Sequence, residues 1–154
     1  MVVILEHIDA ISRREERDVI LIEFEESNSG IRAWKQNATR TKIVQWLDDH
    51  DIGWVKCFGV ADEGVLEAYA GQIYVDCPLD ETNSSYRALS DFLEDPDGNA
   101  RFTGYRFLYV PLEIANKKAH HDEPGFWENF EFRPLKKRNL LTYENTFVEV
   151  RISR

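Results

Sequence analysis

The stretch DVILIEFE, residues 18–25, is the part of the sequence on which the expected fold depends. Successive side chains of a strand point to opposite faces of a sheet. Here both alternating sets are largely apolar: Val19, Leu21 and Glu23 form one, and Ile20, Ile22 and Phe24 form the other. A strand that is apolar on both sides is covered on both sides. We therefore predict that this segment is a central strand.

Other segments on either side of this strand carry the periodicity of a helix or a strand. Apolar residues at helical spacing predict helices at residues 3–16, 39–50 and 84–94. Alternating, β-rich runs predict strands at residues 53–60, 65–76, 104–110 and 145–152. The segment ADEG (61–64) has the length and composition of a hairpin turn between the second and third strands.

The order of these elements predicts a fold class. Residues 18–110 read as strand, helix, strand, strand, helix, strand, which is the split βαβ pattern of ferredoxin-like folds. Right-handed crossovers would place both helices on one face of an antiparallel sheet. We predict an α+β domain over residues 1–154, with an added N-terminal helix and an added C-terminal strand.

Size and cysteine content narrow the class of protein. A chain of 154 residues with 43% apolar residues is long enough for one core and short for two. The sequence has no apolar run of the roughly 18 residues that a membrane span needs, and MVVILEHIDAIS lacks the basic lead of a secretion signal. We predict a cytoplasmic location in which Cys57 and Cys77 are reduced thiols, and we predict no cofactor and no metal.

The charge of the chain is negative and unevenly distributed. The net charge is −9, and residues 61–100 hold ten acids against the single base Arg87. Such a segment repels the phosphates of DNA and RNA and favours a basic partner. The sequence therefore predicts a basic protein partner rather than a nucleic acid.

The row AHHDEPGFWENF, residues 119–130, holds the candidate catalytic residues His120, His121, Asp122 and Glu123. Imidazoles and carboxylates are the usual metal ligands and acid–base groups. However, adjacent histidines diverge on a helix and on a strand. The row is also explained as the C-terminal end of a helix that begins at Pro111, because basic residues there complement the helix dipole.

A candidate binding surface combines acids with large aromatic residues. Its members are Asp62, Glu63, Glu67, Phe126, Trp127 and Phe130. Aromatic side chains are enriched at protein interfaces. The alternative is that these three rings cover a core or a sheet edge.

The functional hypothesis is a small, acidic, non-catalytic binding protein that engages a basic partner, as an inhibitor, immunity or regulatory protein does. Two alternatives stay open: a metal-assisted enzyme, in particular a hydrolase, that uses residues 120–123, and a small-molecule-sensing domain. An open sheet edge is also compatible with a homodimer.

Overall fold

The computed structural model describes residues 5–25, 33–62, 69–127 and 148–149, and within them the chain is an α+β protein. The elements, in chain order, are α1 (Ile8–Glu15), β1 (Val19–Phe24), the 3₁₀ helix η1 (Ala33–Gln36), α2 (Ala38–Asp49), β2 (Gly53–Lys56), β3 (Ile73–Asp76), α3 (Ser84–Leu93), β4 (Tyr105–Val110), α4 (Leu112–Asn116), the 3₁₀ helix η2 (Ala119–Asp122) and β5 (Val148–Glu149).

The strands form one sheet in the order β2-β3-β1-β4-β5, and every neighbouring pair is antiparallel. β1 lies between β3 and β4, so the prediction of a central strand is confirmed. The pairing of β1 with β4 runs from Val19 opposite Val110 to Phe24 opposite Tyr105. The segments 18–25 and 104–110, far apart in sequence, are thus direct neighbours.

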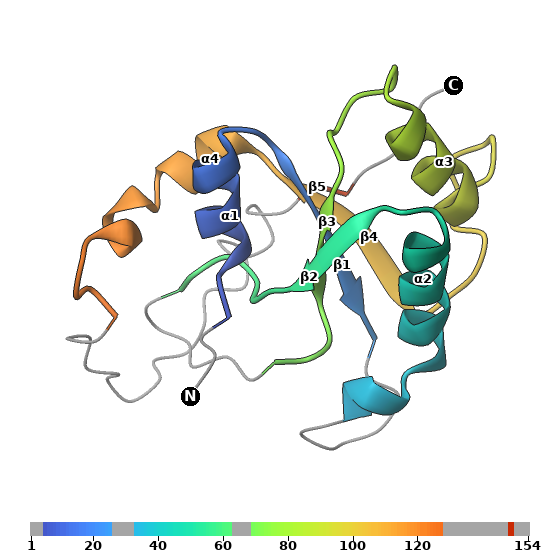
Figure 1. The fold of residues 1–154 in the computed structure, drawn as a ribbon, viewed down its shortest axis with the longest axis horizontal. Helices are drawn as coiled ribbons and strands as arrows, with labels where there is room; N and C mark the ends of the chain where they lie inside the picture. Colours follow the sequence, from blue (N-terminus) through green and yellow to red (C-terminus); the bar gives the residue numbers. More distant parts are fainter. Residues whose placement is uncertain (1–4, 26–32, 63–68, 128–147, 150–154) are drawn as a thin grey trace.

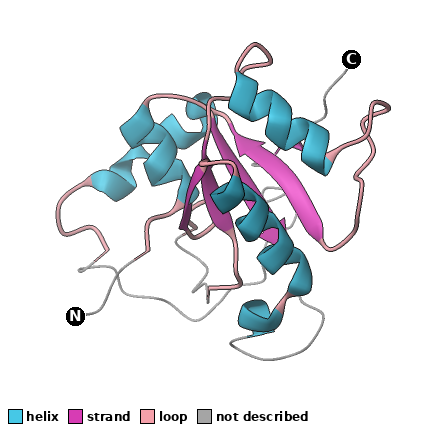
Figure 2. Ribbon diagram, turned by 45° about the vertical axis from the view of Figure 1, so that its right-hand side comes forward, coloured by secondary structure: helices cyan, strands magenta, loops and turns pink. Residues whose placement is uncertain are grey.

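Helices cover both faces of the sheet (Figures 1 and 2). One core cluster joins β1, β3 and β4 to α2 and α3; its members from β1 are Ile20, Ile22 and Phe24. A second cluster joins the opposite faces of the same strands to α1, and its members from β1 are Val19 and Leu21. The two apolar sets of the central strand therefore belong to two cores, as the alternation predicts. α2 and α3 lie together on one face.

β2 and β3 are antiparallel neighbours, as predicted for the strands on either side of ADEG, with Gly53 opposite Asp76 and Lys56 opposite Ile73. Both strands are shorter than the predicted 53–60 and 65–76, and part of the predicted turn lies outside the described residues. The reason for the early end of β2 lies in the residues that follow it. The N–H of Phe58 donates to the carbonyl of Glu6, and the carbonyl of Phe58 accepts from the N–H of Ile8. After β2 the chain thus pairs with the segment before α1.

The same pairing changes the N-terminal helix. α1 begins at Ile8 rather than at residue 3, because His7 is extended and bridges to Phe58. Of the predicted final strand 145–152, the structure describes Val148 and Glu149, which pair with β4.

The two cysteines lie on opposite faces of the sheet, Cys57 in the α1 cluster and Cys77 in the α2–α3 cluster. They are therefore not bonded to each other. Burial raises the pKa of the Cys77 thiol to about 11, which makes it a poor nucleophile near neutral pH. In the part of the chain that the structure describes, no helix is long and apolar enough to cross a membrane.

Candidate functional site

The row of candidate catalytic residues does not lie at the end of a long helix. α4 ends at Asn116, and His120, His121 and Asp122 belong to the separate 3₁₀ helix η2. His120 and Glu123 are exposed, whereas His121 is 5% exposed. The two imidazole centroids are 4.1 Å apart, yet one ring lies at the surface and the other is buried. The interpretation as the C-terminus of a helix begun at Pro111 is therefore corrected to a short turn that follows it.

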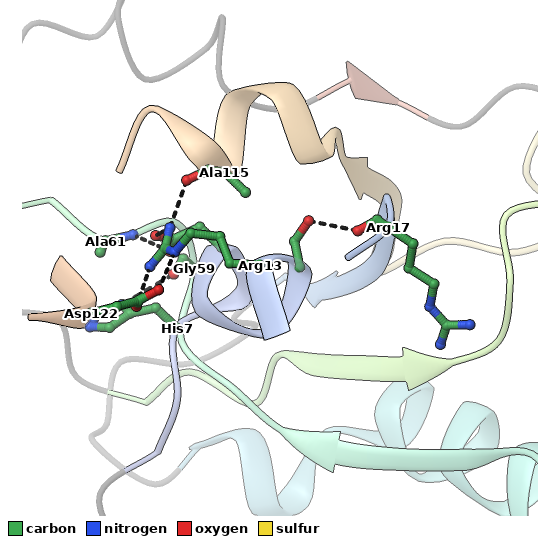
Figure 3. A network of polar contacts seen from close by, with 9 residues as sticks. His7, Arg13, Arg17, Gly59, Ala61, Ala115 and Asp122 are labelled. Atoms are coloured by element: carbon green, nitrogen blue, oxygen red, sulfur yellow. Dashed lines mark hydrogen bonds and ion pairs between the residues drawn. The ribbon is translucent and has the colours of Figure 1, made fainter. Parts of the chain in front are cut away.

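Asp122 holds η2 against α1 through Arg13 (Figure 3). Arg13 Nε donates to Asp122 Oδ2 at 2.6 Å, and Nη2 donates to Oδ1 at 2.7 Å, which is a two-pronged ion pair. Nη1 donates to Asp9 Oδ2 at 2.8 Å and to the carbonyl of Ala115 at 2.7 Å. The fully buried Asp9 also accepts from the N–H of Ala61 at 2.9 Å through Oδ1.

This network gives Asp122 a structural role. The hydrogen bonds from Arg13 lower the pKa of its carboxyl group, so it stays ionised at neutral pH and is a poor proton donor there. Both of its oxygens are engaged by the guanidinium. Within the described ranges, no group of three or more His, Cys, Asp or Glu side chains is placed to hold a metal ion.

Two of the predicted interface aromatics lie in a cluster of rings beside this network. The His7 ring stacks on Trp127 at a centroid distance of 5.3 Å, and His121 lies 4.9 Å from the same indole. Phe126 meets Trp127 edge-on at 4.9 Å. His7 Nδ1 also donates to the carbonyl of Gly59 at 3.2 Å. Trp127 and Phe126 are thus half-buried against histidines, where they help to attach residues 119–127 to α1.

The acidic members of the predicted surface are only partly described. Asp62 is half-buried near the end of the segment that follows β2. Glu63, Glu67 and Phe130 lie outside the described residues. The structure therefore does not test whether the six predicted binding residues form one surface.

A different surface, which the sequence analysis did not single out, combines aromatic rings and acids. The rings of Trp46 in α2 and Phe92 in α3 are parallel to within 6° and stack at a centroid distance of 4.6 Å. His50 stacks on Trp46 at a centroid distance of 4.0 Å, and the Phe102 centroid lies 5.5 Å from that of Phe92. Trp46, Phe92 and Phe102 rest against the core and remain partly exposed. We call these four residues the helical ring stack.

Exposed acids lie near the helical ring stack, together with one cation, Lys42, whose Nζ lies 4.0 Å from the Phe102 centroid. The two segments that build this side of the molecule, residues 38–51 and 76–101, hold ten acids and four bases, a net charge of −6. Asp48, Asp49 and Asp51 are exposed at the C-terminal end of α2, and Asp91 is exposed beside Phe92. Acids at a helix C-terminus oppose the helix dipole, so they are not there to stabilise α2. One of them, Asp48, accepts a hydrogen bond from Trp54 Nε1 at 2.9 Å.

No protein-family model, curated protein or solved structure matches this chain. The function must therefore be argued from the arrangement of its side chains.

The sequence holds part of the signal for the helical ring stack. His50 follows Trp46 by four residues, which is the spacing that brings side chains together on a helix. The contact between Trp46 and Phe92 has no such signal, because it joins two helices that the sheet places side by side. Helical periodicity assigned both rings to apolar stripes and could not show that they meet at the surface.

Proposed function

We propose that this chain is a small, non-catalytic binding protein of the cytoplasm that engages a basic partner protein through its α2–α3 face. An inhibitor, an immunity protein or a regulator works in this way. The observation that carries the proposal is the helical ring stack, exposed among acids on the side of the molecule that holds most of its negative charge.

The ring stack supports binding because it is preorganised. Trp46 and Phe92 are fixed by their contact with each other and with the core below, so little side-chain freedom is left to lose when a partner covers them. Aromatic rings of this kind, partly exposed and rigid, are common anchors of protein interfaces.

The charges around the stack support the choice of partner. Two segments that together carry a net charge of −6 attract a basic protein over distances comparable to the Debye length, about 8 Å at physiological ionic strength. Such steering raises the rate of association and excludes acidic competitors. The Trp and Phe rings then supply the apolar contact that slows dissociation of the complex.

We further propose that the fold is of the ferredoxin-like kind, extended at one sheet edge by β5. The strand order β2-β3-β1-β4, with all neighbours antiparallel, and the location of α2 and α3 on one face support this assignment. Because this fold hosts many unrelated activities, it adds no weight to the functional proposal.

The test is association measured with variants of the α2–α3 face. The natural partner is captured by crosslinking in cells, identified, purified and titrated against the chain at low and high salt. We expect Trp46→Ala to weaken binding by roughly tenfold or more, the loss typical of an interface anchor. Asp49→Lys with Asp91→Lys should weaken binding strongly at low salt and less at high salt.

A matched charge reversal on the opposite side of the molecule is the control. Glu113 is exposed on α4, and Glu113→Lys should leave the affinity nearly unchanged. The pair Asp62→Lys and Glu67→Lys tests the acidic segment that the sequence analysis favoured. A partner whose affinity ignores Trp46→Ala and the charge reversals in α2 and α3 would refute the proposal.

A further inference from the structure

Three cations gather around one tryptophan at the N-terminal end of α2. Lys35 Nζ lies 5.6 Å from the centroid of the Trp34 ring, Arg40 Cζ lies at 4.7 Å, and Lys56 Nζ lies at 4.7 Å. The residues come from η1, α2 and β2, so only the folded chain assembles them. In a protein with a net charge of −9, this is a local concentration of positive charge.

Arg40 is the buried member of this group. Its exposure is 9%, and its guanidinium also lies 5.6 Å from the centroid of Trp54. Nε donates to the carbonyl of Gly71 at 2.8 Å, and Nη2 donates to the hydroxyl of Tyr69 at 3.2 Å. Within the described residues no carboxylate forms an ion pair with Arg40.

The neutral partners of Arg40 do not balance its charge. Taking a cation out of water is costly unless an opposite charge accompanies it. Cation–π contacts with Trp34 offset part of that cost, but the same ring also attracts Lys35 and Lys56. These three like charges repel one another. An anion among them would relieve both the desolvation of Arg40 and this repulsion.

Other arginines show that the chain does not lack carboxylates for pairing. Arg13, Arg14, Arg17 and Arg106 each form an ion pair with Asp or Glu in the described part of the chain. Lys35 and Lys56 are exposed and, like Arg40, form no ion pair with a described carboxylate.

We propose that Lys35, Arg40 and Lys56 form a binding site for a small polyanion that carries two or more phosphate groups. A guanidinium offers five N–H donors in a planar fork that fits phosphate oxygens. Arg40 uses Nε and one donor on Nη2 for Gly71 and Tyr69, which fixes the orientation of the rest. The two lysines supply mobile ammonium groups that adapt to a second phosphate. The N-terminal end of the α2 dipole adds positive potential at the same place.

The net negative charge of the chain favours a compact ligand over DNA or RNA. DNA and RNA carry phosphates along their whole length, and a chain with a net charge of −9 repels such extended polyanions. A small molecule concentrates its negative charge within the group of three cations. The site is also separate from the α2–α3 ring stack, since its cations surround Trp34 rather than Trp46.

The test is calorimetric titration of the full chain with inorganic pyrophosphate at low salt, compared with orthophosphate. We expect pyrophosphate to bind more tightly than orthophosphate and binding to weaken as salt rises. Lys56→Gln should weaken pyrophosphate binding roughly tenfold, the loss of one charge-assisted contact. Arg40→Met should remove most of the binding, and its folding is checked by circular dichroism.

Lys42→Gln is the matched control, because it removes one positive charge from the same helix. Lys42 lies over Phe102, 4.0 Å from that ring's centroid, and not over Trp34. We expect its pyrophosphate affinity to equal that of the unchanged chain. The proposal is overturned by no detectable pyrophosphate binding, or by equal weakening in Lys42→Gln and Lys56→Gln. A single-stranded oligonucleotide that binds more tightly than pyrophosphate through the same residues would overturn the small-ligand assignment.

Discussion

Arg13 and Arg40 are both removed from water, yet their surroundings are opposite. The Arg13 side chain is 7% exposed and is held by the carboxylates of Asp9 and Asp122. Arg40 is 9% exposed and lies among the rings of Trp34 and Trp54, with a carbonyl and a phenol as hydrogen-bond partners. Arg13 is thus neutralised by carboxylates of the fold. Arg40 lies with two lysines around Trp34, and none of these three cations forms an ion pair with a described carboxylate.

This difference suits the buried charge of Arg13 to a structural role and that of Arg40 to a binding role. Arg13 joins α1 to η2 and to the end of α4, so its hydrogen bonds hold these elements together. Arg40 joins α2 to the segment before β3 through Gly71 and Tyr69, and it carries the additional charge that we assign to ligand binding. Substitutions at the two positions should therefore have different consequences for stability and for binding.

The largest expected effect is loss of stability in Arg13→Met. Removing the guanidinium leaves the fully buried Asp9 without its ion pair, and the N–H of Ala61 is then its remaining hydrogen bond among those described. Breaking a buried pair in this way costs about 3–5 kcal/mol. Arg40→Met should cost less than half as much, because no buried carboxylate loses its partner. Urea unfolding of both variants measures the difference.

Arg14→Met is the control for that experiment. Arg14 is half exposed and pairs with Glu6 and Glu15 at the surface, so its loss should cost about 0.5 kcal/mol or less. If Arg40→Met and Arg13→Met destabilise the chain equally, the distinction between the two arginines fails.

A smaller loss is expected for Gly71→Ala, which disturbs the surroundings of Arg40. Gly71 has φ +97°, and a Cβ there would lie 2.7 Å from the Cβ of Trp34. Left-handed backbone and a clash of this size predict a loss of about 1–3 kcal/mol in urea unfolding. Gly53→Ala is the control, since its added Cβ would meet Asp76 at 3.5 Å, an ordinary contact. Equal stability of the two variants would show that Trp34 is not held as described.

Asn37→Ala should cost about 1 kcal/mol by removing a helix cap. The Asn37 side chain accepts from the N–H of Arg40 at 3.0 Å, and Asn83 does the same for Tyr86 at 3.1 Å in α3. The two Ala variants should therefore lose similar stability. Only Asn37→Ala should also weaken pyrophosphate binding, because only that cap positions Arg40. Similar pyrophosphate affinities in both variants would show that the Asn37 cap does not position Arg40 for binding.

The smallest effect is expected for Asp122→Asn, and it depends on pH. Arg13 lowers the folded-state pKa of Asp122, so this carboxylate stabilises the chain above the unfolded-state value of about 3.9 and loses that contribution as pH falls through the folded value. Asp122 is 49% exposed, so we expect a loss below about 1 kcal/mol at pH 7. Thermal unfolding from pH 7 down to pH 3 should show the two proteins converging. A constant gap over that range would contradict the assignment.

The sequence predicted the faces of the strands well, because alternation is a local property. Ile73 and Val75 point to the α2–α3 core and Tyr74 points to the α1 core, as their spacing indicates. It overestimated the length of β2, because backbone pairing of Phe58 with residues 6 and 8 follows that strand.

The candidate sites were harder to predict for a related reason. The HHDE row is conspicuous in sequence, and its aspartate proves to be an anchor for an arginine more than a hundred residues earlier. Nothing in the spacing of Lys35, Arg40 and Lys56 indicates a shared tryptophan, nor does any local pattern join Trp46 to Phe92. Each of these sites is made by elements that the sheet brings together.

The amino-acid order alone determined the α+β class, the two-sided burial of the central strand and the negative charge of the chain, since periodicity and composition follow from neighbouring residues. Only the tertiary structure decided which charges are neutralised and which remain uncompensated. That outcome depends on distances between side chains from different elements, because electrostatic and stacking energies depend on separation in space and not on separation along the chain.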